Sequence, residues 1–375
     1  MVAGTTFGTL LSVNRGQSWS WLCDDSVGYD DNTEDPTYVI TNSDTLLAAT
    51  VHGLSISRDS GCSWSLAGAA LAGAWITDLA QASDGSIWLT TAVFDRPSGV
   101  FVSHDDAKSF QAAGPADDGV VWLSLRIAGP IMYVSGLRAP AVQGDPAQAV
   151  LHVSHDSGQT WVERTTPAPS STDPTALRLL WVAGDVVFTR TTRDNQNVLH
   201  VSHDGGQTWQ EALAVDEAEI TSVIALPEPG HFLAGTRFSG VYRSSDDGMT
   251  FTLQPSPSRL ACAASHPADG MLYGCADDRE DSMALGRSAD GMTWSSVLTW
   301  AKIGQPLACP AASPQAESCE PRWPVVAGTL GIAIDNDPGD PGASDKDSGC
   351  GGGSAAMLLF LPILPWWRSR RRADL

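Results

Sequence analysis

The chain has 375 residues, a formal net charge of -21 and 14 tryptophans, whereas its lysines are limited to Lys108, Lys302 and Lys346. A chain of this length buries a large core, and all-β folds of this size often form one domain. Its negative field repels the phosphates of nucleic acids and anionic membrane surfaces, so we expect no nucleic-acid partner. An acidic surface that is poor in lysine mainly keeps a protein soluble.

The amino-terminal residues resemble the middle of a repeat rather than a secretion signal. Residues 1–7 (MVAGTTF) align with residues 232–238 (FLAGTRF), and they contain no basic stretch followed by a long apolar run. We therefore expect that an upstream segment is missing, which would carry the signal peptide and a first strand.

An eight-residue motif, S-x-D-x-G-x-[S/T]-[W/F], recurs about every 45 residues and is called the box below. One box has Asn14 in place of Asp, another has Ala107 in place of Gly, and the last is one residue shorter. A single box is a weak signal, but seven at regular spacing indicate a repeat architecture. The boxes occupy residues 12–19, 57–64, 103–110, 154–161, 202–209, 244–251 and 288–294.

Each box has the chemistry of a tight turn between two strands. Asp and Ser oxygens accept hydrogen bonds from nearby backbone N–H groups, and Gly adopts a positive φ without steric cost. The terminal aromatic residue starts the next strand and can pack between repeats. We expect a structural role for two sets of residues: Asn14, Asp59, Asp105, Asp156, Asp204, Asp246 and Asp290, and Trp19, Trp64, Phe110, Trp161, Trp209, Phe251 and Trp294.

Short apolar strands flank the boxes, for example at residues 46–50 and 232–236. Four short strands per unit at this period predict the blade of a β-propeller. Before residue 340 no stretch has the length and the 3.6-residue period of an amphipathic helix. The sequence therefore predicts an all-β, seven-bladed propeller over residues 1–334, closed by pairing strands at residues 1–7 and 323–329.

The seven cysteines include no CxxC pair and no Cys/His zinc spacing, so we expect no metal site. Two close pairs in similar contexts predict the local disulfides Cys262–Cys275 and Cys309–Cys319 and an oxidising compartment. Buried free thiols are the alternative, and Cys23 with Cys62 is a possible third pair.

The carboxyl-terminal residues differ in composition from the repeats. Residues 335–353 are rich in Asp, Gly, Pro and Ser, which predicts a flexible linker. Residues 354–375 combine an apolar run with an Arg cluster, which stays cytoplasmic by the positive-inside rule. The run is shorter than the roughly 20 residues of a full membrane span and contains two prolines.

The boxes resemble those of the Asp-box (BNR) repeat family, over residues 1–334. That family includes sialidases, sortilin-type receptor ectodomains, xyloglucan-cleaving glycosidases and photosystem assembly factors, so the shared fold does not determine the function. The tail, with SGCGGG ahead of its apolar run, resembles the MYXO-CTERM sorting tags of Gram-negative bacteria. This resemblance implies that Cys350 is the processing or anchoring residue for a membrane sorting protease; a simple membrane anchor is the alternative.

The sequence assigns no catalytic residue. The nearest match to a sialidase F/Y-R-I-P motif is residues 125–128 (LRIA), which lacks the aromatic residue and the Pro. None of the five tyrosines has an obvious Glu partner. A glycosidase that uses two carboxylates is harder to exclude, because its acid and base can come from distant loops. Candidate carboxylates outside the boxes are Asp78, Asp84, Asp185, Asp194 and Glu219.

Three His-Asp pairs, at residues 104–105, 155–156 and 203–204, belong to different repeats at one register, so we expect them to lie far apart and to be structural. Acidic loops at residues 23–37 and 277–283 match no calcium-loop spacing, and we expect no cofactor. The sequence thus favours an exported monomer, anchored to the cell envelope, that binds or scaffolds an envelope protein or polysaccharide. A glycoside hydrolase is the alternative, and an assembly factor is a third class.

Overall fold

The computed structural model describes residues 1–29, 36–93, 96–140, 142, 145–167, 176–266 and 270–333. Residues Met1–Ile334 form one compact unit. The predicted linker, the apolar tail and Cys350 lie outside the described residues. Within the described part of the chain, no helix is both long and apolar enough to cross a membrane.

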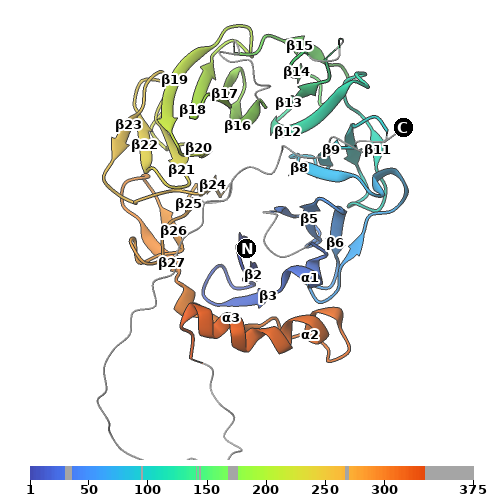
Figure 1. Cartoon of the computed structure of the whole chain (residues 1–375), viewed down its shortest axis with the longest axis vertical. Coiled ribbons are helices and arrows are strands. Elements are labelled where there is room, and N and C mark those ends of the chain that lie inside the picture. The colour runs from blue at the N-terminus through green and yellow to red at the C-terminus, as the bar shows by residue number, and fades with distance from the viewer. Residues whose placement is uncertain are drawn as a thin grey trace, which may run out of the picture. The chain divides into compact units, whose positions relative to one another are not determined.

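Seven four-stranded sheets stand around a central axis, which confirms the predicted seven-bladed β-propeller (Figure 1). In blades 2 to 7 the four strands follow one another along the chain and pair in antiparallel fashion. The first strands of these blades lie nearest the axis, where those of blades 2 to 6 each contact the first strand of the next blade. The fourth strands form the rim.

The strand bounds of the first four blades are as follows. Blade 1 contains β1 (Val2–Thr5), β2 (Gly8–Leu11), β3 (Trp19–Leu22) and β28 (Ile303–Pro306). Blade 2 contains β4 (Thr37–Ile40), β5 (Leu46–Thr50), β6 (Gly53–Ser57) and β7 (Ser65–Leu66). Blade 3 contains β8 (Trp75–Gln81), β9 (Ile87–Ala92), β10 (Val100–Ser103) and β11 (Gln111–Ala112). Blade 4 contains β12 (Val120–Ala128), β13 (Ile131–Arg138), β14 (Gln148–Ser154) and β15 (Val162–Arg164).

The other three blades repeat the pattern. Blade 5 contains β16 (Arg178–Ala183), β17 (Val186–Arg193), β18 (Gln196–Ser202) and β19 (Gln210–Asp216). Blade 6 contains β20 (Ile220–Ala225), β21 (Phe232–Thr236), β22 (Val241–Ser244) and β23 (Thr252–Gln254). Blade 7 contains β24 (Cys262–Ser265), β25 (Leu272–Cys275), β26 (Leu285–Ser288) and β27 (Ser295–Leu298).

Both ends of the propeller chain meet in blade 1, as expected, but through a different strand. β28 pairs in parallel with β3, at Ile303 with Trp19 and Pro306 with Trp21. The predicted closing strand at residues 323–329 is wrong, because these residues form the helix α3 (Trp323–Leu330). Trp323 and Ala327, one helical turn apart, are both buried in one cluster with Trp21, so packing determines the structure of this segment.

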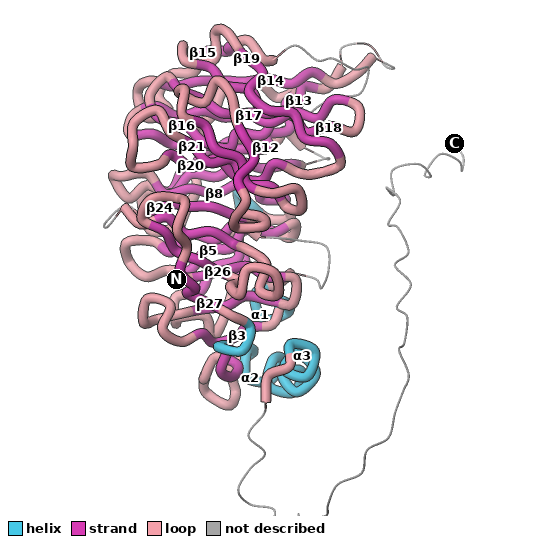
Figure 2. The backbone as a smooth tube through the Cα atoms, turned by 90° about the vertical axis from the view of Figure 1, so that its left-hand side faces the viewer, coloured by secondary structure: helices cyan, strands magenta, loops and turns pink. Residues whose placement is uncertain are grey.

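The helices that occur before residue 340 are short and lack the length of the amphipathic helices for which the sequence was searched. The structure contains α1 (Asp24–Val27), α2 (Pro314–Cys319) and α3, with short 3-10 turns η1 (Ala69–Leu71), η2 (Trp300–Lys302) and η3 (Glu320–Arg322). Figure 2 shows the three α-helices gathered beside β3. α2 and α3 are too short for a periodicity search, and each begins with a proline in its first turn.

Three disulfides connect the described cysteines. Cys262 and Cys275 face each other in β24 and β25, a separation of 13 residues. The predicted pairing of Cys309 with Cys319 is wrong, as is that of Cys23 with Cys62. Instead, Cys319 bonds to Cys23 across 296 residues and Cys309 bonds to Cys62 across 247 residues. The segment after blade 7 is thus attached covalently to blades 1 and 2.

We predict that the long-range disulfides stabilise the closed ring more than the local one. Cross-linking distant residues removes more entropy from the unfolded chain, about 5 kcal/mol for the Cys23–Cys319 loop against about 3 kcal/mol for Cys262–Cys275. The double variant Cys23→Ala/Cys319→Ala should therefore unfold at a lower denaturant concentration than Cys262→Ala/Cys275→Ala. Equal losses in the two variants would contradict the role assigned to ring closure.

Candidate functional site

All seven boxes form turns at the end of the third strand of a blade (the second strand in blade 1), and they share one set of hydrogen bonds. In the box of blade 4, Ser154 Oγ donates to Asp156 Oδ1 at 2.7 Å and accepts from Gly158 N at 2.8 Å. Asp156 also accepts from the backbone N and the hydroxyl of Thr160, at 2.8 and 2.6 Å. The Thr160 hydroxyl, followed by its backbone N–H, lowers the pKa of Asp156 to about 2. These carboxylates are occupied within their own turns.

The three irregular boxes keep this turn by small adjustments. Asn14 accepts from Ser18 N, and its amide nitrogen donates to the Ser18 hydroxyl at 2.8 Å. Ala107 takes the place of Gly at a φ of 60° and still donates to Ser103 Oγ at 3.0 Å. In the shortened seventh box, Asp290 accepts from two successive backbone N–H groups, those of Met292 and Thr293.

The box glycine presses directly on the preceding blade. A Cβ added at Gly158 would lie 2.3 Å from Trp88 Cη2 of blade 3, and one at Gly248 would lie 2.2 Å from Phe188 Cζ of blade 5. The same contact closes the ring, because a Cβ at Gly16 of blade 1 would lie 2.6 Å from Val297 of blade 7. In the six boxes that have Gly at this position, close packing joins two blades and leaves little room for a side chain, whereas the third box accommodates the methyl group of Ala107.

The box aromatic residues also bridge blades. Trp161 Nε1 donates to Ala113 O in the preceding blade at 3.0 Å, and Trp209 Nε1 donates to Thr165 O at 3.0 Å. Trp19 is fully buried, whereas the other six aromatic rings are half-buried. The box residues predicted to be structural thus lie in seven separate turns around the propeller, and the structure does not bring them together into one site.

A ladder of charged residues crosses blades 3 to 6: Asp78, Arg126 and Arg178 belong to the first strands β8, β12 and β16, Arg190 belongs to the second strand β17, and Glu219 precedes β20. Asp78 pairs with Arg126 Nη1 at 2.7 Å, and Arg190 Nη1 pairs with Glu219 at 2.6 Å. Arg178 lies between these two pairs and donates to Leu123 O of the preceding blade at 2.5 Å. Burial lowers the pKa of Arg178, which is half-buried. These contacts hold neighbouring inner strands together.

The candidate carboxylates do not form a catalytic pair. Asp78 is buried and accepts from Leu79 N and Leu125 N as well as from Arg126, so the LRIA segment contributes an ion pair. Glu219 contacts Arg237 and Arg190. The other three candidates lie in separate hairpin turns: Asp84 in the β8–β9 turn of blade 3, and Asp185 and Asp194 in the β16–β17 and β17–β18 turns of blade 5.

Two tyrosines, Tyr29 and Tyr133, are buried, and internal contacts hold the acidic loop at residues 277–283. Burial raises the pKa of Tyr133 to about 12, and it raises that of Tyr29 further. In the loop at residues 277–283, Asp277 accepts from two backbone N–H groups and pairs with Arg259, while Asp281 accepts from Ser258. The loop at residues 23–37 lies partly outside the described residues.

Asp117, His152 and Glu163 in blade 4 have ligand atoms within 4.8 Å of one another, which is close enough for a metal ion. Arg138 lies among them and binds Asp117 Oδ2 at 2.6 Å and Glu163 Oε2 at 2.8 Å. The hydrogen bonds that Arg138 donates to Glu163 and then to Asp117 raise the pKa of Arg138, and burial lowers the pKa of His152. The guanidinium group supplies the positive charge at this position.

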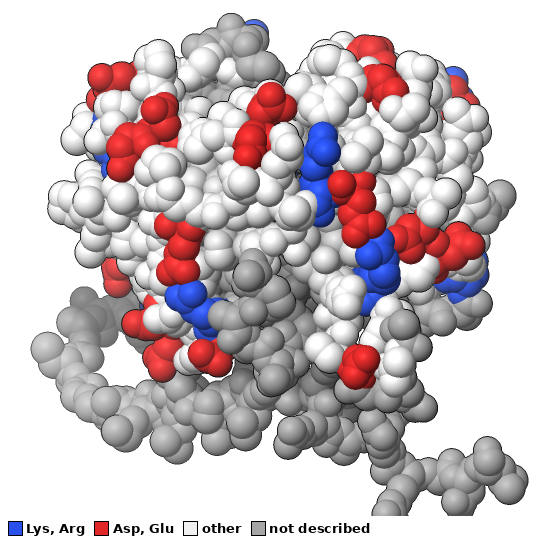
Figure 3. Space-filling view, turned by 90° about the horizontal axis from the view of Figure 1, so that it is seen from above, with Lys and Arg blue, Asp and Glu red and all other residues white. Residues whose placement is uncertain are grey.

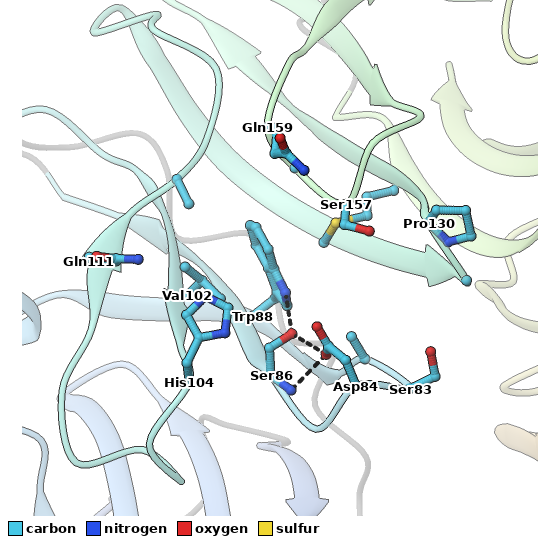
Figure 4. Close-up of a pocket in the computed structure, with 15 residues that line it drawn as sticks. Ser83, Asp84, Ser86, Trp88, Val102, His104, Gln111, Pro130, Ser157 and Gln159 are labelled. Carbon is cyan, nitrogen blue, oxygen red and sulfur yellow. Dashed lines mark hydrogen bonds between the residues drawn. The ribbon is translucent and has the colours of Figure 1, made fainter.

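A cavity of about 490 Å³ opens between blades 3 and 4, on the side that carries the box turns. Trp88 of β9 forms its floor, and the box turn of blade 4 provides Ser157 and Gln159 (Figure 4). His104, the second residue of the box of blade 3, and Gln111, which follows this box, line the opposite side. Residues from two blades thus converge on one concave surface.

Asp84 is the one carboxylate among the described residues that line this cavity. Its Oδ1 accepts from the backbone N and the hydroxyl of Ser86, at 2.9 and 2.6 Å, and Ser86 Oγ accepts from Trp88 Nε1 at 3.0 Å. The Ser86 hydroxyl, followed by its backbone N–H, lowers the pKa of Asp84, which is therefore ionised at neutral pH. Asp84 is a hydrogen-bond acceptor rather than a proton donor.

The side chains of His104, Gln111 and Gln159 have no hydrogen-bond partner within the described parts of the chain, so they can bind a ligand. The sequence analysis did not find this cavity, because its walls come from two different repeats. One signal was available: His104 lies in the third box and Gln111 directly follows it. The outer face in Figure 3 has a different character, since its basic side chains lie beside acidic ones rather than in a patch.

We predict that the buried box serine is essential for stability and that its histidine neighbour is not. The change Ser154→Ala leaves the N–H of Gly158 without its partner and removes one of the hydrogen bonds that Asp156 Oδ1 accepts, which should lower the free energy of unfolding by about 1–3 kcal/mol. His155 is exposed, so His155→Ala should leave stability unchanged. Chemical denaturation of both variants measures the difference; a loss for His155→Ala would point to an unrecognised role.

We also predict that stability declines in mildly acidic solution because of His200. Burial lowers the pKa of His200 from 6.5 to about 4 in the fold, where its Nε2 lies 2.9 Å from Thr191 Oγ1. The unfolded chain takes up the proton first, so stability present above pH 6.5 is lost as the pH falls toward 4. The melting temperature of His200→Gln should vary less with pH over this window than that of the unmodified protein. An unchanged profile would assign the pH dependence to other groups.

No family model and no curated protein matches the sequence. Solved structures do match. The extracellular domain of BT4673 from B. thetaiotaomicron has a TM-score of 0.53 and 16% identity over 76% of this chain and 36% of that chain. PorZ, a surface component of the type-IX secretion system of Porphyromonas gingivalis, has a TM-score of 0.50 and 14% identity over 78% and 45%.

The GH74 xyloglucanase from Xanthomonas campestris matches at a TM-score of 0.45 and 16% identity, over 78% of this chain and 56% of that chain. The chain thus spans about a third to a half of the length of these proteins. At these identities the similarities concern the fold alone, and they show that the chain is a β-propeller.

Proposed function

We propose that this protein is an exported Asp-box propeller, anchored to the cell envelope, that binds a protein or polysaccharide partner in the cavity between blades 3 and 4. One observation carries the proposal: hydrogen-bonding side chains from two blades surround a concave surface with a Trp floor. Such a combination of concave shape, apolar floor and a few converging polar groups is typical of ligand sites.

The polar groups of the cavity suit a ligand with hydroxyl or amide groups. His104, Gln111 and Gln159 provide donors and acceptors on both walls, and ionised Asp84 adds an acceptor. A glycan or a polypeptide segment offers matching groups in rows. Since the protein has a net charge of -21, a neutral or basic ligand is favoured over an acidic one.

Binding fits the cavity better than hydrolysis does. Most glycosidases need two carboxyl groups that flank the scissile bond, one of which is protonated. Among its described lining residues the cavity has one carboxylate, Asp84, whose pKa is lowered by Ser86. We therefore assign this site a binding role.

Export and anchoring are supported by different features. The three disulfides indicate an oxidising compartment. The box turns, with their repeated Ser, Asp and Gly hydrogen bonds, support membership of the Asp-box family. The composition of residues 335–375 supports a sorting tag of the MYXO-CTERM type that is processed at Cys350, although these residues lie outside the described structure.

The test uses the unit Met1–Ile334 with a panel of neutral plant and bacterial-envelope polysaccharides, and it measures both binding by calorimetry and release of reducing sugar. For the ligand that binds, Gln111→Ala/Gln159→Ala should weaken affinity about tenfold or more, since each net hydrogen bond contributes about 1 kcal/mol. The matched control is Gln207→Ala/Gln210→Ala, at the corresponding positions of blade 5, which should leave affinity unchanged.

Two outcomes would contradict the proposal. Equal weakening by both double variants would place the ligand outside the cavity. Sugar release that disappears on changing one carboxylate outside the boxes would identify the protein as a glycoside hydrolase.

A further inference from the structure

The junction between blades 4 and 5 corresponds in strand register to the cavity between blades 3 and 4. Tyr133 of β13 pairs with Val153, the residue directly before a box serine. Trp88 of β9 pairs with Val102 at the same place in blade 3. The ring of Tyr133 therefore has the position between blades 4 and 5 that the Trp88 ring has in the cavity.

The outer strands of blades 3 and 4 differ at one position beside these rings. Arg164 of β15 pairs with Leu151. Ala113 has the corresponding place in blade 3, where its N–H donates to Val100 O at 2.9 Å. Arg164 lies against the box of blade 5, because a Cβ added at Gly206 would lie 3.4 Å from Arg164 Cβ. Ala113 contributes only a methyl group at this position, and it lines the cavity.

Arg164 brings a positive charge to the junction between blades 4 and 5. Its side chain is half-buried, and its Nε atom is buried. Burial, followed by the charge of Asp185, raises the pKa of Tyr133 to about 12, and the charge of Arg164 opposes this rise. An arginine of this chain is thus held near an aromatic ring and a carboxylate, where blade 3 has an alanine.

The cavity between blades 3 and 4 has the aromatic ring and the carboxylate, but no lysine or arginine among its described lining residues. Asp84 Oδ1 accepts from Ser86, whereas Asp84 Oδ2 accepts no hydrogen bond within the described part of the chain. Figure 4 shows this carboxylate beside the Trp88 ring. Asp84 belongs to blade 3 and Asp185 to blade 5, so the two junctions share the kinds of groups rather than every position.

We propose that the cavity between blades 3 and 4 binds an arginine side chain of a partner polypeptide. The guanidinium group would donate to Asp84 Oδ2 and to the amide oxygen of Gln111 or Gln159, with its plane against the Trp88 ring. The net charge of -21 attracts a cationic side chain to this position. This inference rests on the proposed binding function and specifies the partner as a polypeptide that presents an arginine.

An arginine suits the cavity better than a lysine or an amino sugar does. A guanidinium group donates in one plane to several acceptors and stacks on aromatic rings, whereas an ammonium group is a compact and strongly hydrated charge. The acceptors come from both walls, Asp84 and Gln111 from blade 3 and Gln159 from blade 4. Arg164 provides an example of an arginine that this fold holds beside a box turn.

Peptide binding tests the inference. The probe is a pentapeptide with blocked ends and one arginine between glycines, and its matched partner carries citrulline, which has a similar shape without the charge. Calorimetry with the unit Met1–Ile334 at low ionic strength should show saturable binding of the arginine peptide. The citrulline peptide should bind about tenfold more weakly or worse, because a hydrogen bond between charged groups is lost.

Two substitutions of one carboxylate each separate the cavity from the overall charge. Asp84→Asn keeps the oxygen that accepts from Ser86 and removes the negative charge, so it should weaken binding of the arginine peptide about tenfold or more. Asp118→Asn changes the net charge equally at an exposed residue of the loop before β12, and it should leave the affinity unchanged.

A substitution at Ala113 tests the same site from within the chain. Ala113→Arg introduces the arginine that blade 4 has at this position, so it should occupy the cavity and weaken peptide binding about tenfold or more. Its melting temperature should exceed that of Ala113→Met, whose side chain has no charge. In the Asp84→Asn background this difference should disappear.

Three results would overturn the inference. Equal binding of the two peptides would show that the charge is not recognised, and equal weakening by Asp84→Asn and Asp118→Asn would show that only the net charge attracts the peptide. Binding of a glucosamine oligomer without binding of the arginine peptide would identify a glycan ligand. If Gln111→Ala/Gln159→Ala weakens that glycan binding, the proposed binding function stands without the arginine partner, whereas no binding by either class contradicts both.

Discussion

Contact between the box glycine and an apolar side chain of the preceding blade determines how the propeller is assembled. Ser and Asp side chains fix the turn, the turn presents a backbone without a Cβ, and the preceding blade packs against it, as Gly248 does on Phe188. A β-sheet of four strands cannot bury both of its faces alone, so each blade depends on its neighbours. The contact of Gly16 with Val297 joins the last blade to the first and closes the circle.

Packing between neighbouring blades closes the ring. The positions that differ between the repeats are not needed for this packing and are available for function. The cavity beside Trp88 forms between two boxes whose variable positions carry polar side chains, and the ladder from Asp78 to Glu219 stabilises the inner strands behind it. Blade 1 departs from the repeat most strongly, with its outer position taken by β28. The repeated Ser, Asp and Gly residues of the boxes thus build the turns, whereas variable positions of two boxes line the cavity.

The sequence was sufficient for features that local chemistry determines. Seven boxes predicted seven blades, because each box encodes its own turn through residues within eight positions. Features that depend on distant contacts were predicted incorrectly or not at all. Cys309 and Cys319 lie close in sequence yet bond to blades 2 and 1, and residues 323–329 resemble β1 but form a helix against Trp21. The cavity forms only where blades 3 and 4 pack side by side, so the sequence of a single repeat does not reveal it.

The most direct test of the interlocking boxes compares two glycines that both have positive φ. Gly248, at a φ of +79°, would place an added Cβ 2.2 Å from Phe188, whereas Gly129, at +63°, would meet no atom within 4 Å. Backbone strain is shared by Gly248→Ala and Gly129→Ala, so their difference in unfolding free energy reports the contact between blades. We predict that Gly248→Ala loses about 1–3 kcal/mol more than Gly129→Ala. Equal losses would show that the boxes are turns only and that the ring is held by other contacts.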